Sequence, residues 1–106
     1  MNQPFEFENT QDENGNPAGG FARATGIDIR WQNGPLGRGE ERKEPNGAFT
    51  ETLIEIVLRR LEFYQNSKFS CRENALVITK LEEALHWIQH RTRAREARGV
   101  EGIHEK

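Results

Sequence analysis

The chain has 106 residues, 34% hydrophobic and 30% charged, with a mean hydropathy of −0.87, so it forms at most one domain with a thin core. Its single cysteine, Cys71, excludes an internal disulfide, and extra burial is therefore expected from a homo-oligomer. A net charge of −2 disfavours a duplex-DNA binder, and the lack of a membrane-length apolar run or secretion signal predicts a soluble, intracellular protein with no membrane partner.

The N-terminal third contains two contrasting segments. Residues 1–18 are acidic and rich in Asn, Gln and Pro without a sustained hydrophobic period, so we expect a flexible arm followed by a single domain over 19–106. Over 19–34, apolar and polar side chains alternate on either side of Thr25-Gly26. This alternation predicts an antiparallel β-hairpin with one apolar face.

Residues 35–47 form a predicted polar loop. The segment contains prolines, glycines and charged residues and shows no hydrophobic period. A loop of this length in a small domain is usually either functional or disordered. Both interpretations stay open: the loop is a lid that closes over a ligand, or it is disordered.

The sequence after the polar loop predicts a helical hairpin over residues 48–98. The first helix is expected to begin after Asn46, a favourable N-cap residue, and to run over about 48–66. Its apolar residues cover an arc of roughly 220°, wider than the stripe of about 100° that one neighbour covers. We therefore expect this helix to pack on two neighbours.

The second helix has recognisable signals at both ends. Ser70 and Glu73 fit a capping box, and Gly99 fits a left-handed stop after residue 98. The short link between the helices predicts an antiparallel pair. The expected fold is thus α+β: a small N-terminal antiparallel β-hairpin followed by a two-helix antiparallel hairpin, assembled as a homo-oligomer.

Three arginines near the end of the second helix are the strongest anion-binding signal. Arg91, Arg95 and Arg98 are spaced i, i+4 and i+7, so they share one helix face. Guanidinium groups bind phosphate oxygens in a bidentate manner. The alternative is a solvated helix end, where cations complement the helix dipole.

Two residues near the interhelical turn have groups that bind nucleobases. Asn74 lies on the apolar face of the second helix, and its carboxamide can read an adenine edge or can bond to the turn. Tyr64 ends the first helix, and its ring can stack on a base or pack in the core. For both residues the two interpretations stay open.

Catalytic and metal-binding patterns are weak. His86 and His90 are spaced i, i+4, but no further ligand is evident, and Cys71 has no base partner close in sequence. No phosphate-binding loop or paired-carboxylate motif occurs. We expect neither an enzyme nor a metal or cofactor site.

Helix geometry restricts where a nucleotide site can form. Asn74 and Arg91 are 17 residues apart on one helix, which corresponds to about 25 Å. A small nucleotide cannot touch both residues in one chain. If both contact the same ligand, the site lies between two chains packed antiparallel about a two-fold axis, in the oligomer that the thin core already favours.

Several short stretches, in order, carry a resemblance. The chain resembles the phage Thoeris anti-defence sponge family over about 19–106, and its helical hairpin is also similar to that of the phage anti-CBASS sponges. The stretches are 29–35 (IRWQNGP), 46–49 (NGAF), 63–65 (FYQ), 71–75 (CRENA), 81–85 (LEEAL) and 91–104 (RTRAREARGVEGIH).

The resemblance implies a protein that does no chemistry. Family members assemble as dimers or hexamers and bind glycocyclic ADP-ribose, the signal made by bacterial TIR-domain enzymes, in the cytoplasm of the infected host. Some members also hold cyclic di- or trinucleotides at separate sites of a hexamer. A protein of this kind would keep the signal from its effector.

The resemblance also implies roles for particular residues. Tyr64 is similar to the family's adenine-stacking aromatic residue and Asn74 to its base-reading amide. Arg91 and Arg95 resemble its phosphate-binding arginines. Further counterparts are Arg30, at the end of the hairpin, and Arg38 or Arg42 in the polar loop.

Three rival functions make different demands on the sequence. A small RNA-binding or other nucleic-acid-binding oligomeric module would use the C-terminal arginine face. A signal-degrading enzyme would need a general acid or base, for which Glu73, His86 and His104 are the candidates. A structural protein would form an oligomer and bind no ligand.

Overall fold

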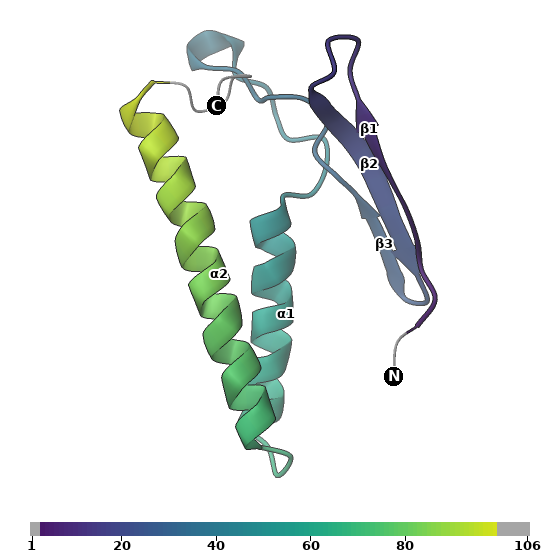
Figure 1. The fold of residues 1–106 in the computed structure, drawn as a ribbon, viewed down its shortest axis with the longest axis vertical. Coiled ribbons are helices and arrows are strands. Elements are labelled where there is room, and N and C mark those ends of the chain that lie inside the picture. The colour runs from purple at the N-terminus through teal and green to yellow at the C-terminus, as the bar shows by residue number, and fades with distance from the viewer. Residues whose placement is uncertain (1–2, 100–106) are drawn as a thin grey trace. The chain divides into compact units, whose positions relative to one another are not determined.

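The computed structural model describes residues 3–99 and confirms the α+β class, with antiparallel strands followed by two helices (Figure 1). The chain divides into two compact units. Among the described residues, the sheet unit comprises 3–49 together with Gly99, and the helical unit comprises 50–98. No helix in this part of the chain is both long and apolar enough to cross a membrane.

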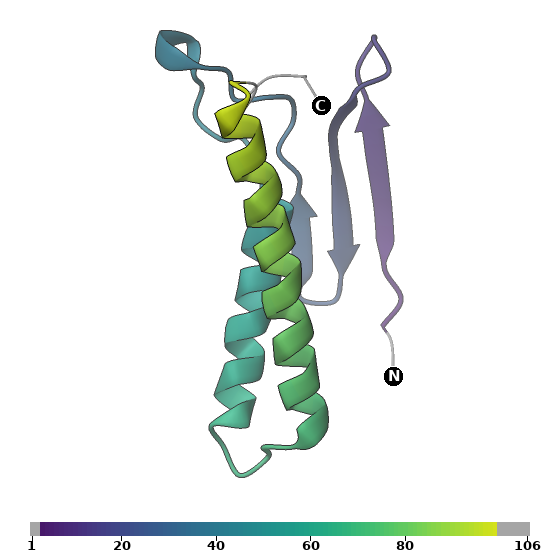
Figure 2. The ribbon, with the colours of Figure 1, turned by 60° about the vertical axis from the view of Figure 1, so that its left-hand side comes forward.

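The sheet has three antiparallel strands in the order β1-β2-β3: β1 Glu6–Gln11, β2 Pro17–Ala24 and β3 Ile27–Arg30 (Figure 2). The predicted hairpin is confirmed as β2 and β3, joined at Thr25-Gly26, where Gly26 has a φ of +78°.

The flexible arm predicted for residues 1–18 is wrong for the part that forms β1 and the start of β2. A local turn explains the difference. The Asp12 carboxylate accepts hydrogen bonds from the backbone N–H groups of Asn14 and Asn16, at 2.9 and 3.0 Å. Gly15 then supplies a φ of +79°. Such an aspartate turn closes a β-hairpin despite the polar composition.

Cross-strand pairing gives the sheet a polar and an apolar face. Arg23 on β2 lies between Glu6 and Asp28, with ion-pair distances of 3.8 and 3.6 Å. The next row of the ladder runs from Phe7 through β2 to Ile29. Because successive side chains alternate in direction, this second row lies on the opposite, apolar face.

The first helix, α1 Thr50–Gln65, begins later than predicted. Asn46 is not its N-cap. The Asn46 carboxamide accepts from the Asn33 N–H at 2.8 Å and donates to the Asn33 carbonyl at 3.1 Å. Ala48 meanwhile forms a β-bridge with Trp31. These contacts keep Asn46 and Ala48 outside the helix, so α1 begins only at Thr50.

The second helix, α2 Arg72–Ala97, begins one residue later than the predicted capping box implies. Its N-cap is Cys71 instead of Ser70, and the Cys71 Sγ accepts from the Asn74 N–H at 3.4 Å. Gly99 confirms the predicted left-handed stop, with a φ of +73°. Figures 1 and 2 show α1 and α2 side by side and antiparallel, as predicted.

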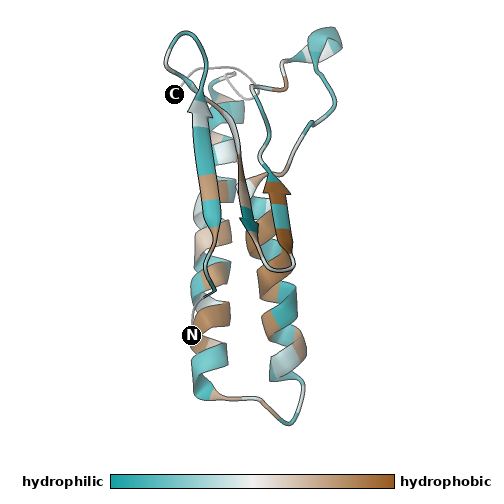
Figure 3. Cartoon of the chain, turned by 90° about the vertical axis from the view of Figure 1, so that its right-hand side faces the viewer, coloured by the Kyte–Doolittle hydropathy of each residue, from teal (hydrophilic) through white to brown (hydrophobic). Residues whose placement is uncertain are grey.

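The helical unit leaves much apolar surface uncovered. Among the described residues, Leu58 is the one buried hydrophobic side chain, at 4% exposure, and it lies on α1. Ile56 on α1 and Trp87 on α2 are 61% and 65% exposed. Figure 3 shows hydrophobic residues, in brown, recurring along both helices. Within the helical unit α1 packs on α2 alone, and the second neighbour stays a prediction.

The polar loop contains one turn of 3-10 helix, η1 Gly39–Glu41. The backbone N–H of Lys43 donates to the Leu36 carbonyl at 2.6 Å, and that of Arg42 donates to the Gly39 carbonyl at 3.2 Å. These bonds fold 36–43 back on itself. The lid function stays a prediction.

Candidate functional site

Tyr64 presents an accessible ring one residue before the end of α1. Its side chain is 38% exposed, and the Phe63 ring lies edge-on to it at 6.0 Å. Arg60, one turn earlier, donates from a guanidinium nitrogen to the Tyr64 Oη at 3.1 Å. The Arg60 Cζ lies 4.8 Å from the Tyr64 ring centroid. Tyr64 is therefore held by a cation, and Arg60 is a site residue that the sequence interpretation missed despite its i, i+4 spacing.

Asn74 occupies the third position of α2 and is half-buried. Its backbone N–H is taken by the cap, whereas its carboxamide has no hydrogen-bond partner among residues 3–99. The interhelical turn is instead held by Gln65, whose side chain donates to the Cys71 carbonyl at 2.9 Å and accepts from the Cys71 N–H at 3.1 Å. The purely structural interpretation, a bond from Asn74 to the turn, is therefore not what the fold shows.

The arginines near the end of α2 differ in exposure. Arg91 and Arg98 are exposed, whereas Arg95 is half-buried on the helix. Within the described part of the chain, Arg91 has no carboxylate at ion-pair distance. An unpaired, exposed guanidinium is available to bind an anion.

The helical unit does not bring its two candidate ends together. Tyr64 and Asn74 flank the interhelical turn, and Arg91 and Arg95 lie near the opposite end of α2. The rise of an α-helix places Asn74 and Arg91 about 25 Å apart. One chain thus carries two separate sets of candidate residues, an aromatic and amide end that is predicted to bind a base and an arginine end that is predicted to bind phosphate.

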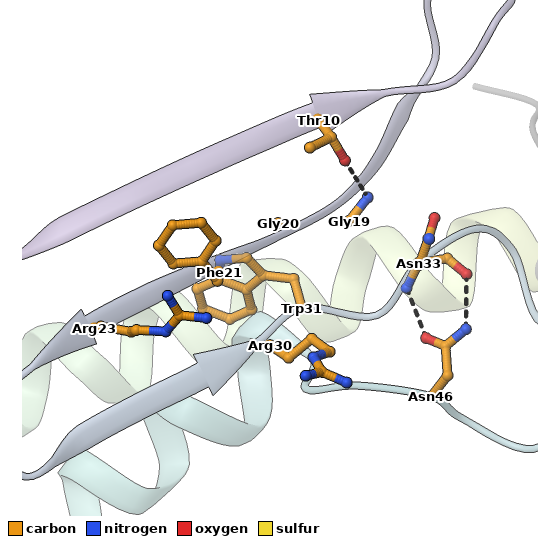
Figure 4. A pocket seen from close by; sticks show the side chains of 9 residues that line it. All are labelled: Thr10, Gly19, Gly20, Phe21, Arg23, Arg30, Trp31, Asn33 and Asn46. Carbon is orange, nitrogen blue, oxygen red and sulfur yellow. Dashed lines mark hydrogen bonds between the residues drawn. The ribbon is translucent and has the colours of Figure 1, made fainter.

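The three further arginine candidates belong to the sheet unit. Arg38 donates to the Gly99 carbonyl, and Arg42 makes a long bond of 3.5 Å to the Gly37 carbonyl. Arg30 lines a hollow on the sheet of ≈ 420 Å³, which we call the sheet pocket (Figure 4). Its lining residues are Thr10, Gly19, Gly20, Phe21, Arg23, Arg30, Trp31, Asn33 and Asn46.

Among residues 3–99, the candidate metal-binding side chains do not form a metal site. His86 and His90 flank the exposed Trp87, with ring centroids 5.6 Å from the indole in each case. Residues 3–99 contain no group of three or more His, Cys, Asp or Glu side chains placed to hold a metal ion. Glu73 lies in the first turn of α2, and His104 is outside the described residues.

One charged cluster has a structural role. The Arg59 guanidinium binds the Glu62 carboxylate at 2.6 Å and the Glu55 carboxylate at 3.0 Å. The hydrogen bonds that Arg59 donates to Glu62, and then to Glu55, raise the pKa of Arg59 above its ordinary value. All three residues lie on one side of α1, so Arg59 offers a control for substitutions at the candidate arginines.

Comparison with known proteins identifies the family to which residues 23–93 belong. A family model described as the Acb2/Tad1 hairpin domain matches residues 23–93. A curated relative, Thoeris anti-defense 1 of Bacillus phage SBSphiJ7, is 62% identical over 78 residues, which cover 74% of this chain and 52% of the relative. The chain therefore spans about half the length of that relative. From the extent of the family match, the chain belongs to the Acb2/Tad1 hairpin domain family.

Proposed function

We propose that the chain is a phage anti-defence protein that binds a cyclic nucleotide signal, glycocyclic ADP-ribose, and sequesters it unchanged inside the infected bacterium. Family membership and the name of the Bacillus phage relative support the anti-defence role. The observation that carries the ligand proposal is the free carboxamide of Asn74 and the accessible ring of Tyr64, which flank the interhelical turn, with Arg91 and Arg95 towards the other end of α2.

The two ends of the helical hairpin are joined in this proposal by a second copy of the chain. Two helical hairpins packed antiparallel about a two-fold axis would place the arginine end of one against the Tyr64 end of the other, twice per dimer. The same contact would cover exposed apolar side chains such as Ile56 and Trp87. A dimer is sufficient to join the two ends and to cover these side chains, and a hexamer is the larger assembly that the resemblance implies.

Each residue type has a defined task in the proposed site. The Tyr64 ring stacks on adenine, a contact worth about 1–3 kcal/mol. The Asn74 carboxamide pairs with the adenine edge. Arg91 and Arg95 bind the phosphate oxygens. Arg30, Arg38 and Arg42 stay predictions as further phosphate contacts, with the polar loop as a lid.

The function requires tight binding and no reaction. A sequestering protein succeeds when its dissociation constant lies below that of the effector and its sites outnumber the signal molecules. The same logic extends to cyclic di- or trinucleotides as further ligands. No catalytic group enters the proposal.

A recovery experiment tests the proposed sequestration directly. The purified protein is incubated with glycocyclic ADP-ribose, retained on a filter and heated, and the released compound is identified by mass spectrometry. We expect the ligand to disappear from the filtrate and to return intact. A changed product would identify an enzyme, and an undepleted filtrate would contradict sequestration.

Matched variants locate the binding. Asn74→Ala and Arg91→Ala are expected to abolish depletion while the assembly, measured by sedimentation velocity, is retained. Arg59→Ala removes an arginine that is also exposed but belongs to the ion-pair cluster on α1, and this variant is expected to deplete the ligand like the wild type. Retained binding in both Asn74→Ala and Arg91→Ala would overturn the proposed site.

A further inference from the structure

The sheet pocket is built by a single chain. Its residues come from all three strands and from the segments that follow β3, so no second copy is needed to complete it. Figure 4 shows Phe21, Arg23 and Trp31 gathered at one side, Asn33 paired with Asn46 at the other, and Arg30 between. Its ≈ 420 Å³ lies within the range of about 300–1,000 Å³ typical of small-molecule sites.

The pocket carries positive charge that the fold does not neutralise. None of its lining residues is acidic. Arg30 has no carboxylate at ion-pair distance within residues 3–99. Arg23 shares its charge with Glu6 and Asp28 at long distances of 3.8 and 3.6 Å and lies 4.2 Å over the Phe21 ring. Arg30 is thus the guanidinium available for an anion.

Flat aromatic surface and hydrogen-bonding groups surround that charge. The Trp31 indole lines the pocket, and neither its N–H nor the Asn33 carboxamide has a hydrogen-bond partner in the described chain. The neighbouring Asn46 carboxamide is already engaged by the Asn33 backbone. A ligand that combines a planar base with an oxyanion would use the indole, the free amide and Arg30 together.

Two glycines allow close backbone contacts next to the pocket. Gly20 has a φ of +140°, and a Cβ there would collide with the Glu8 carbonyl oxygen. A Cβ on Gly47 would collide with the Trp31 carbonyl group. The backbone therefore approaches closely at both places, which a residue with a Cβ would prevent.

We propose that the sheet pocket is a mononucleotide-binding site, complete in one chain and separate from the site assigned to the helical unit, and that Arg30 serves this pocket instead of acting as a further phosphate contact of the helical site. Arg30 binds the phosphate, the Trp31 indole stacks on the base, and the Asn33 carboxamide bonds to the base edge. This site does not depend on the proposed function of the helical unit, because its residues all belong to the sheet unit.

Tryptophan fluorescence tests this site. The chain has two tryptophans, so Trp87→Phe leaves Trp31 as the reporter, and Asn74→Ala in the same chain disables the helical site. Titration with AMP is expected to change Trp31 emission saturably. Adenosine and inorganic phosphate, each alone, are expected to bind at least about tenfold more weakly than AMP, because each offers half of the contacts.

Variants of Arg30 decide the assignment. Arg30→Ala in that background is expected to weaken AMP binding by about tenfold or more, Arg30→Lys by less, and Arg59→Ala not at all. Circular dichroism checks that each variant is folded. An unchanged Trp31 signal, equal binding of adenosine and AMP, equal binding of phosphate and AMP, or undiminished binding in both Arg30 variants would overturn the proposal.

Discussion

The sheet unit and the helical unit differ in how far each is completed within one chain. The strands of the sheet pair with one another within one chain. The sheet pocket is lined by residues of all three strands and of the segment that follows β3. The helices leave Ile56 and Trp87 exposed and place complementary polar groups at opposite ends. The proposed site on the sheet is therefore complete in a monomer, whereas the proposed site on the helices requires another copy.

The strongest test of this contrast is complementation between inactive chains. Tyr64→Ala removes the base-binding end and Arg91→Ala removes the phosphate-binding end, so each variant alone is expected to lose ligand binding. In a mixed dimer, one of the two sites combines the intact ends of both chains. Random exchange in an equal mixture should restore about a quarter of the wild-type capacity, measured by equilibrium dialysis with glycocyclic ADP-ribose.

The double variant provides the control for complementation. A chain carrying both Tyr64→Ala and Arg91→Ala, mixed with either single variant, cannot form an intact site and should restore nothing. Recovered binding in that mixture, or none in the mixture of single variants after exchange, would show that the two ends do not meet across chains.

The second test breaks the assembly. Ile56 is 61% exposed and lies about 200° around α1 from the buried Leu58, so Ile56→Glu spares the packing against α2. A carboxylate buried at a chain interface is costly, and sedimentation velocity should show smaller species. Binding of glycocyclic ADP-ribose should fall with the assembly, while the AMP response of Trp31 should persist.

Ile56→Leu is the matched control for that substitution. It keeps an apolar side chain of the same size, and the assembly should be retained. If Ile56→Glu left the assembly intact, this face of α1 would not be the interface. If the Trp31 response disappeared together with the assembly, the contrast between the two units would be lost.

Local signals were sufficient to predict the β2–β3 hairpin, the helical pair and the Gly99 stop. Strand β1 was missed because the acidic and amide residues of this segment are typical of a flexible arm. The turn at Asp12 was the local feature that indicated a β1–β2 hairpin. The start of α1 was misplaced because Asn46 bonds to Asn33, 13 positions away in the chain. Such a long-range contact competes with the local cap and has no signature in a linear pattern.

The candidate sites show the same division. The two ends of the helical hairpin could be placed from spacing alone, because the rise of a helix is fixed. Arg60 could also have been found from its i, i+4 spacing to Tyr64. The sheet pocket could not, because it depends on the strand register that brings Arg30 opposite Phe21 and on the path of the chain after β3.

Arg60 offers a smaller, graded test of the helical site. We expect its guanidinium to hold the Tyr64 ring in place, so Arg60→Ala should weaken binding of glycocyclic ADP-ribose by about two- to fivefold, the scale of an exposed cation–π contact. Isothermal titration calorimetry measures the change, and Arg59→Ala is the neighbouring control. Tighter binding in Arg60→Ala would mean that Arg60 blocks the ring instead of orienting it.

The smallest expected effect concerns the helix cap beside Asn74. The Cys71 Sγ accepts the Asn74 N–H at 3.4 Å, and a serine hydroxyl is a stronger acceptor at an N-cap. Cys71→Ser should raise the free energy of unfolding in urea by a few tenths to about 1 kcal/mol, and Cys71→Ala should lower it. Hydrogen exchange should slow in the first turn of α2 in Cys71→Ser and leave the β2–β3 ladder unchanged. Equal stability of the serine and alanine variants would show that the thiol does not cap α2, and a matching change in the sheet would show that the two units unfold together.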